Sequence, residues 1–272
     1  MGMTIVEKIL ARAGGRRQVA AGDLVVVDVD LAVMLDASFQ ATQRREILKV
    51  HDPERVAVVY DHMVPAPDRQ AAEAHAYGRA FVRRFGIRRF HDVGPDQGIC
   101  HAIVADHAYA LPGTVLVCGD SHTCASGAFN CAARGIGAPD LVAAVTTGKT
   151  WFRVGPTIRY DLEGALKPGV SAKDLFLHIA GNWGHHTNQN VEFGGPALAG
   201  LGIDARRTIA AMGPSFPPNS PPSSPTSSSS PMSGRAPRPR SHRNTPTPMR
   251  VMPSGGASIS TGLNRSSPCP MR

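Results

Sequence analysis

The chain has 272 residues and a formal net charge of +8, with 6% aromatic residues. The charge is uneven: residues 213–272 hold seven arginines and no acidic residue, which leaves 22 basic against 21 acidic side chains in residues 1–212. Nucleic-acid binding requires a basic surface with stacking groups. Residues 1–212 are near neutral, and the basic segment 213–272 has one aromatic residue, Phe216, so no nucleic-acid partner is expected.

The segment 213–272 differs in composition from the rest of the chain, because it is rich in proline, serine and arginine. Such a segment buries too little apolar surface to offset its ordering entropy, so we expect a disordered tail. Residues 1–212 are long enough for one sizeable domain.

The composition of residues 213–272 is also typical of a GC-rich gene read out of frame. A frameshift near Met212 is therefore one origin of the tail, and a genuine tail is the other.

No membrane-spanning or secretory segment is expected. The N-terminal residues lack a continuous apolar core, and no apolar run approaches the roughly 20 residues that a membrane span needs. The five cysteines are odd in number and form no CxxC pair. Reduced thiols in a cytoplasmic protein are therefore the default expectation.

Helix and strand patterns alternate along residues 1–212. Thr4 and Glu7 form a capping-box pattern for the first helix. Ser171 and Asp204 are expected N-caps of later helices, and Gly86 is an expected helix end. In chain order the patterns predict a helix that ends at Gly14, strands at 24–29 and 56–60, a helix at 68–85, a strand at 88–93, a helix at 100–109, a strand at 114–118, helices at 124–135 and 139–147, strands at 151–154 and 157–160, a helix at 172–179, a strand at 191–193 and a helix ending at Met212. This alternation predicts a three-layer α/β/α fold, with helices on both faces of a sheet.

The most informative motif is the stretch 117–123, which places an acid, a hydroxyl and an imidazole at Asp120, Ser121 and His122. It follows a predicted strand and leads into the predicted helix at 124–135. Free backbone N–H groups and the helix dipole attract anions at such a turn. The motif therefore predicts a pocket for a small carboxylate or phosphate.

Three further polar groups lie at the ends of predicted strands. The pair Asp61-His62 follows a strand, His101 follows a glycine-containing loop, and the stretch 183–190 precedes the strand at 191–193. Strand ends are where an α/β pocket forms, so we expect six of these residues to lie on one side of the sheet, in a single open cleft: Asp61, His62, His101, Asp120, Ser121 and His122. The other histidines have a simpler interpretation: surface or core residues at His91, His107 and His178.

The run 117–129, continued by Gly135, Ile136 and Gly137, resembles the signature of the aconitase superfamily. Within that superfamily, the large subunits of the 3-isopropylmalate dehydratase and homoaconitase type are the most similar. The motifs at 61–62, 98–101 and 188–196 fall in the order and spacing of the family. The resemblance covers about residues 4–212.

The resemblance implies a hydro-lyase that moves water across a double bond in a small di- or tricarboxylate, as in leucine biosynthesis. In the family, a 4Fe-4S cluster acts as a Lewis acid on the substrate, and a small swivelling subunit or domain is a partner. The resemblance also implies roles for six residues: Asp61, His62, His101 and Asp120 in protonating the departing hydroxyl, His122 beside the iron-bound water, and Ser121 as a ligand of a substrate carboxylate.

The sequence departs from the family pattern at two places. Leu35 stands where the family has His or Gln, so one hydrogen bond to substrate is lost there. The family's three cluster cysteines lie downstream of the position of Met212, and this sequence does not contain their pattern. Cys118, Cys124 and Cys131 are spaced C-x5-C-x6-C and are interpreted as packing residues, so this chain is not expected to bind the cluster.

Two classes of function remain open after the sequence. The first is a hydro-lyase large subunit, of which this chain is a truncated, inactive form. The second is a non-catalytic pseudoenzyme or carboxylate-binding fragment. A serine hydrolase is weaker, because Ser121 and His122 are adjacent but no GxSxG elbow surrounds them.

Overall fold

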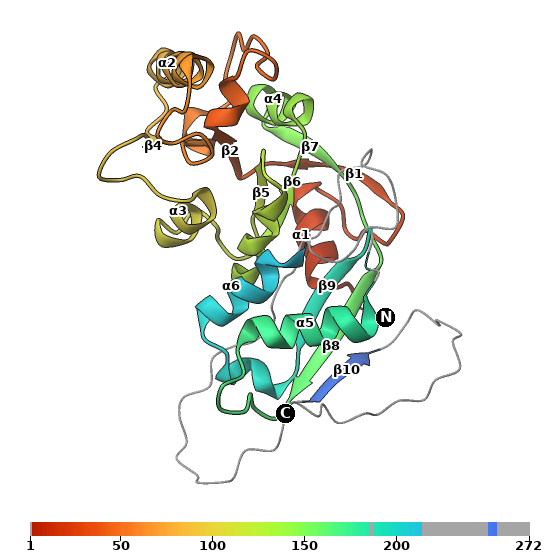
Figure 1. Cartoon of the computed structure of the whole chain (residues 1–272). Coiled ribbons are helices and arrows are strands. Elements are labelled where there is room, and N and C mark those ends of the chain that lie inside the picture. The colour runs from red at the N-terminus through yellow and green to blue at the C-terminus, as the bar shows by residue number, and fades with distance from the viewer. Residues whose placement is uncertain (1, 185, 187, 214–249, 255–272) are drawn as a thin grey trace.

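The structure of the chain is a computed structural model that describes residues 2–184, 186, 188–213 and 250–254 (Figure 1). The predicted disordered tail lies outside these described residues except for Gly213 and one short strand, β10 (Arg250–Ser254). Strand β10 pairs antiparallel with β8 (Thr157–Glu163).

A five-stranded parallel sheet forms the centre of the fold and confirms the predicted α/β class. Its strands run in the order β4-β3-β2-β5-β6, and every neighbouring pair is parallel. The strands are β2 (Leu31–Leu35), β3 (Val56–Val59), β4 (Arg89–His91), β5 (Val115–Cys118) and β6 (Ala132–Gly135). Because the strands are parallel, all their carboxyl ends lie at one edge of the sheet.

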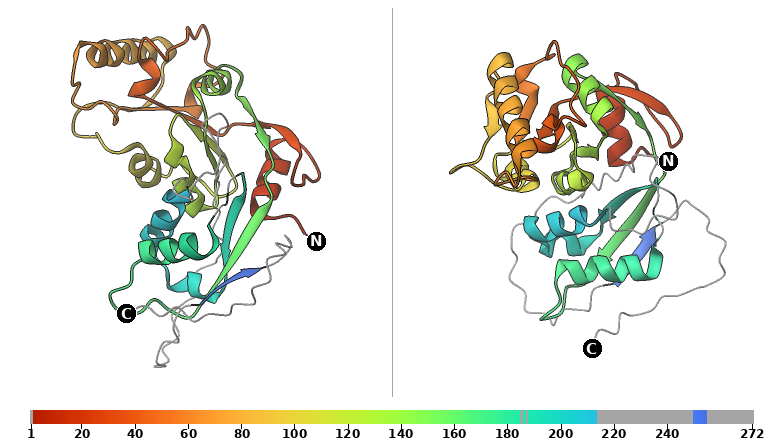
Figure 2. Two further views of the ribbon diagram at one scale, coloured as in Figure 1. Left: turned by 45° about the vertical axis from the view of Figure 1, so that its right-hand side comes forward. Right: turned by 45° about the horizontal axis from the view of Figure 1, so that its top comes forward.

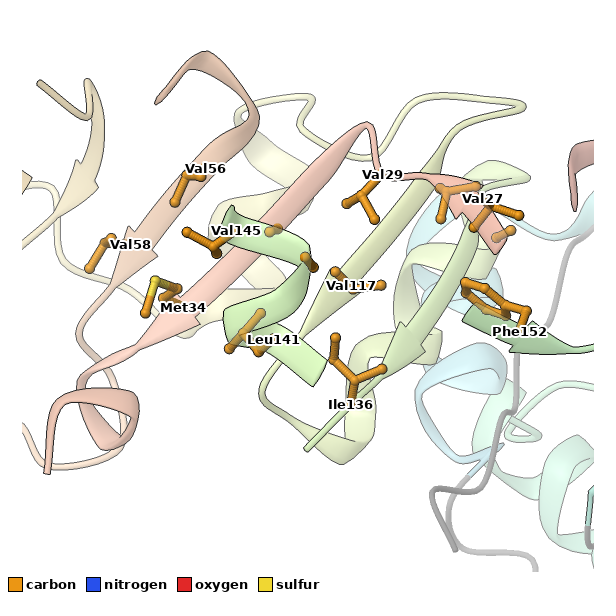
Figure 3. Packing of buried hydrophobic residues seen from close by; sticks show 14 of the residues in the cluster. Val27, Val29, Met34, Val56, Val58, Val117, Ile136, Leu141, Val145 and Phe152 are labelled. Atoms are coloured by element: carbon orange, nitrogen blue, oxygen red, sulfur yellow. The ribbon is translucent and has the colours of Figure 1, made fainter. Parts of the chain in front are cut away.

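Helices cover both faces of this sheet (Figures 1 and 2). One face packs against α1 (Ile5–Ala13), α2 (Arg69–Phe85) and α4 (Ala138–Thr147). Figure 3 shows Leu141 and Val145 of α4 over Met34 and Val117 of the sheet. The other face packs against α3 (Cys100–Asp106) in a smaller core. The expected sandwich of helices around the sheet is thus confirmed.

Local capping signals place most of the helix ends. Thr4 and Glu7 form the predicted capping box of α1. Asp68 caps α2 by accepting the N–H of Ala71, and Gly86 ends that helix in the left-handed conformation with φ 67°. Asp204 is not the N-cap of α6 (Ile203–Ala211): Gly202 takes that position, and Asp204 lies in the first turn. An acid in the first turn still interacts favourably with the helix dipole.

The helix predicted at 124–135 is wrong. The chain instead forms a 3₁₀ helix, η3 (Ser121–Phe129), followed by Asn130 in the left-handed conformation and then by strand β6. The small residues of this segment allow close packing, since Ala132 and Ala133 are fully buried in β6. Pairing of β6 also gives the backbone groups along the edge of β5 their partners, which a helix at this position would leave unpaired.

A third hydrophobic core lies beside the main sheet (Figure 2). It is built from β8, β9 (Asn190–Gly194), α5 (Ala172–Trp183), η4 (Pro196–Gly200) and α6. Ser171 caps α5 as predicted. A separate antiparallel ribbon joins β1 (Leu24–Asp28) and β7 (Lys149–Arg153). None of the helices in the described ranges has the length and apolar character needed to cross a membrane.

Candidate functional site

Three neighbouring strands of the parallel sheet are each followed by an aspartate within two residues. Asp36 follows β2, Asp61 follows β3 after Tyr60, and Asp120 follows β5 after Gly119. Strand β2 lies between β3 and β5, so the three carboxylates reach the same stretch of the carboxyl edge. Ligands bind at this edge in open α/β sheets.

Asp120 joins three segments of the chain. Its Oδ1 accepts a 2.6 Å hydrogen bond from His101 Nε2, on α3, and the backbone N–H of His122 at 2.7 Å. Its Oδ2 lies 3.3 Å from His62 Nε2, in the loop after β3. The hydrogen bond from His101 lowers the pKa of the Asp120 carboxyl well below its usual range; burial opposes this, and the His122 N–H assists it. Asp120 is therefore held as a carboxylate among donors.

His62 lies between two carboxylates, since its Nδ1 is 2.6 Å from Asp61 Oδ1 and its Nε2 faces Asp120. The other oxygen of Asp61 accepts the N–H of Cys100 at 2.7 Å, which fixes Asp61 against the start of α3. Burial lowers the pKa of His62, but the hydrogen bond and charge of Asp61, with Asp120 and Asp36, raise the pKa overall. The arrangement favours an imidazolium ion at this position.

Ser121 and His122 begin η3 and lie at the surface beside Asp120. Ser121 Oγ is 3.1 Å from His122 Nδ1, and the His122 side chain is 52% exposed. A hydroxyl and an imidazole are thus presented to solvent next to the buried acid. The structure brings all six predicted site residues into one hydrogen-bonded network, and their chemical roles stay predictions.

Asp36 belongs to this network although no sequence motif singled it out. It opens η1 (Asp36–Phe39), is fully buried, and accepts the N–H groups of His62 at 3.2 Å and Met63 at 2.6 Å. Its position after a strand was a usable signal, but strand β2 was not predicted, so the signal was lost. Leu35, directly before it, is 1% exposed and packs in the core on the α3 face.

The described cysteines do not fit an iron–sulfur cluster. Cys118 and Cys131 pack in the core on the α3 face, and Cys124 Sγ donates to the carbonyl of Ala210 at 3.1 Å. Burial raises the pKa of the Cys131 thiol to about 12, and the neighbouring Cys118, with burial, raises the pKa of Cys100 far above its usual range. Iron binds thiolates, and the raised pKa values of Cys100 and Cys131 disfavour that form in these two residues.

One group of ligand-type side chains converges among the described residues, with atoms of Asp36, Asp61 and His62 within 4.8 Å of one another. Each carboxylate oxygen of the two aspartates already accepts a hydrogen bond from an N–H group of the protein. A cation would have to replace those bonds, so the group is not assigned as a metal site.

A cavity of about 20 Å³ lies away from these residues, between α2 and α4, lined by Phe39 and Leu141 among others. The open cleft stays a prediction.

Replacing His62 with glutamine should reduce stability more at pH 5.5 than at pH 8.5. The pKa of His62 is raised in the folded state, so its contribution is complete below the unfolded pKa of about 6.5 and is lost as pH rises through the folded pKa. The side chain is 41% exposed, so the change between the two pH values should stay below about 1 kcal/mol.

Urea unfolding at both pH values measures the difference, with His178→Gln on α5 as the histidine control outside the network. Equal losses of unfolding free energy at pH 5.5 and 8.5 would contradict a raised pKa at His62.

Comparison with known proteins adds an independent finding. The family described as the aconitase family (aconitate hydratase) matches residues 12–216. The chain is 50% identical over 213 residues to the 3-isopropylmalate dehydratase large subunit of Mycolicibacterium smegmatis, covering 78% of this chain and 50% of that protein. A probable 3-isopropylmalate dehydratase large subunit of Methanothermobacter thermautotrophicus is 41% identical over 221 residues, covering 78% of this chain and 52% of that protein. The chain thus spans about half the length of the curated relatives it matches.

Proposed function

The chain belongs to the aconitase family, and from this premise we propose that it carries acid–base and carboxylate-binding residues of a hydro-lyase of the 3-isopropylmalate dehydratase type. The observation that carries this proposal is the shared carboxylate of Asp120, which accepts a hydrogen bond from His101 Nε2 and lies within reach of His62 Nε2. A carboxylate that binds one ring nitrogen fixes the tautomer of the imidazole and raises its basicity.

The proposed chemistry is the dehydration of a hydroxy acid and its reversal. Dehydration breaks one C–O bond and one C–H bond and forms a C=C bond: the C–H proton passes to a base, to which no described residue is assigned, and the hydroxyl leaves as water. Hydroxide is a poor leaving group, so it needs a proton as the C–O bond breaks. Asp120 holds Nε2 of His101, so we assign the donated proton to Nδ1 of the His101 imidazolium. His62, between Asp61 and Asp120, keeps positive charge next to this carboxylate.

Ser121 and His122 are the proposed ligands of the substrate. Ser121 begins η3 and presents an exposed hydroxyl to an incoming anion. The hydroxyl of Ser121 would donate a hydrogen bond to a substrate carboxylate, and the exposed His122 would add a second donor. A substrate with two carboxylates, such as 3-isopropylmalate, fits this pair of donors beside the acid at His101.

A small-subunit partner is proposed because the matched relatives are named as large subunits. The family cluster supplies Lewis-acid chemistry to substrate oxygens when it is bound. The described thiols do not fit that cluster, so no step is assigned to it. This observation favours a second candidate function, in which the chain binds carboxylates without turning them over.

The binding half of the proposal is tested by titrating the full chain with 3-isopropylmalate while recording the imidazole signals in NMR spectra. We expect the ring signals of His62, His101 and His122 to shift together, and binding to weaken as salt is added. Ser121→Ala should weaken binding about tenfold, because a hydrogen bond to a charged group is lost.

Ser171→Ala is the matched serine control, because Ser171 caps α5 away from the network. Isovalerate, which keeps the branched chain but has one carboxylate, is the ligand control. Alkene formation, followed anaerobically with added iron and sulfide, separates the two functions: turnover supports the hydro-lyase, and binding without turnover supports the second candidate. Absence of any shift in the three histidines would overturn both.

A further inference from the structure

Asp36 is a buried charge with an unusual set of partners. Its side chain is 0% exposed, yet its two oxygens accept the N–H groups of His62, Met63 and its own neighbour Ala37. Burying a carboxylate is costly unless hydrogen bonds compensate for the lost water. Two of these three donors belong to the loop after β3, so the carboxylate binds a neighbouring segment as well as its own.

A second buried group lies against this carboxylate from the opposite side. His75 of α2 has a side chain that is 4% exposed, with Nε2 at 3.5 Å from Asp36 Oδ2. The His75 ring stacks on Tyr60 with ring centroids 4.6 Å apart, and the Tyr60 hydroxyl donates to the His75 carbonyl at 2.8 Å. Helix α2 thus places the His75 ring against Asp36, and Tyr60 directly precedes Asp61 and His62 in the chain.

From this geometry we infer that Asp36 is a positioning residue, whose buried carboxylate holds the backbone at His62 and Met63 so that the His62 ring stays between Asp61 and Asp120. The inference about catalysis rests on the proposed function, but the geometry that it describes does not. Asp36 touches no reacting atom in this proposal and acts through His62.

The charged surroundings of His62 come from every element packed around it. Asp61 lies on its own loop, Asp120 lies at the end of β5, and Asp36 lies at the end of β2 with His75 of α2 behind it. Two more imidazoles face Asp120 from the far side, His101 on α3 and His122 on η3. The charge of Asp36 is among the causes that raise the pKa of His62, so removal of Asp36 changes both the charge and the position of the ring.

The test is the titration of His62 in the full chain, followed by NMR of labelled histidine side chains in the wild type and in Asp36→Asn. We expect the proton affinity of His62 to fall about three- to tenfold in Asp36→Asn, because a nearby carboxylate is removed and the loop loses its anchor. His178, on α5, should titrate unchanged.

Asp30→Asn is the matched control, because Asp30 lies at the other end of β2 and also accepts a backbone N–H, from Val115 at 2.8 Å. That variant removes a carboxylate and a backbone hydrogen bond but should leave the titration of His62 unchanged. An unchanged proton affinity in a folded Asp36→Asn protein would overturn the inference.

Hydrogen exchange of the wild-type chain keeps the inference testable if Asp36→Asn does not fold. The amides of His62 and Met63 should exchange as slowly as those of the neighbouring strand β3, since both donate to a fully buried carboxylate. Exchange of these two amides at the rate of an unstructured loop would refute the positioning role of Asp36. Neither measurement needs substrate, so a negative result would contradict the role of Asp36 without bearing on the proposed function.

Discussion

Replacing Asp120 with asparagine is expected to abolish the ordered network and any binding that depends on it. Asp120 Oδ1 accepts from His101 and from the His122 backbone, and Oδ2 lies next to His62. An amide keeps one acceptor and presents N–H groups to the other donors, so His101 and His62 lose their common partner. Asparagine can still cap η3, so the expected loss comes from the charged hydrogen bonds and should reduce the unfolding free energy by about 2–3 kcal/mol.

Chemical denaturation and the 3-isopropylmalate titration measure this result. If the chain supports turnover, the rate should fall at least about a hundredfold, the usual contribution of a positioned proton donor. Asp92→Asn is the control, because Asp92 accepts hydrogen bonds from Arg79 at 2.6 and 2.8 Å and from the Val93 backbone at 2.7 Å, none of them from a member of the network. A variant at Asp120 that binds ligand as the Asp92 variant does would contradict the central place of this carboxylate.

Gly135→Ala is expected to be among the most destabilising single substitutions in the main sheet. Gly135 ends β6, and an added Cβ would overlap the carbonyl oxygen of Asp120 and lie 3.2 Å from the Cα of Ser121. Strand β6 has little freedom to retreat, because Ile136 N–H donates to the Cys118 carbonyl at 2.9 Å. The backbone of the site would have to move, at a cost of about 3 kcal/mol or more.

Gly137→Ala is the matched control two residues later, where the nearest atom to an added Cβ is Pro139 Cδ at 3.8 Å. That change should cost under about 1 kcal/mol, as expected for alanine in place of glycine at the start of α4. Equal midpoints of denaturation for the two variants would show that β6 and the Asp120 loop are not in tight contact. NMR shifts of His122 should respond to Gly135→Ala only.

Local signals predicted most helix ends because their cause is local. The capping box at Thr4 and the left-handed Gly86 depend on residues a few positions apart. Strand β2 was missed for the opposite reason: four of its five residues are Leu, Ala or Met, which favour a helix, and only its pairing with β3 and β5 makes it a strand. The segment 124–135 was misread because its small residues are compatible with a helix, while tertiary pairing makes part of it a strand.

The candidate site was predicted in its parts and not in its geometry. The motifs at 61–62, 101 and 120–122 each follow a predicted strand, so the sequence indicated that they share an edge. The sequence does not predict which oxygen of Asp120 binds His101, or that His62 lies between two carboxylates. Both depend on the strand register and on the path of the loops, which the spacing of motifs does not give. Asp36 was not predicted as a site residue, because strand β2 was not predicted.

The strand order also dictates when the network can assemble during folding. Strand β2 pairs with β3 close by in the chain, but its other neighbour, β5, begins more than eighty residues downstream, with Leu31 opposite Leu116. Such distant pairing is slow, because the long loop must close before its contacts stabilise it. Asp36 and His62 can therefore meet early, during synthesis, while Asp120 reaches them only after β5 has left the ribosome and inserted beside β2. Assembly of the site would then be among the late events in folding, and folding intermediates would form the hydrogen bonds from His62 and Met63 to Asp36 before those to Asp120.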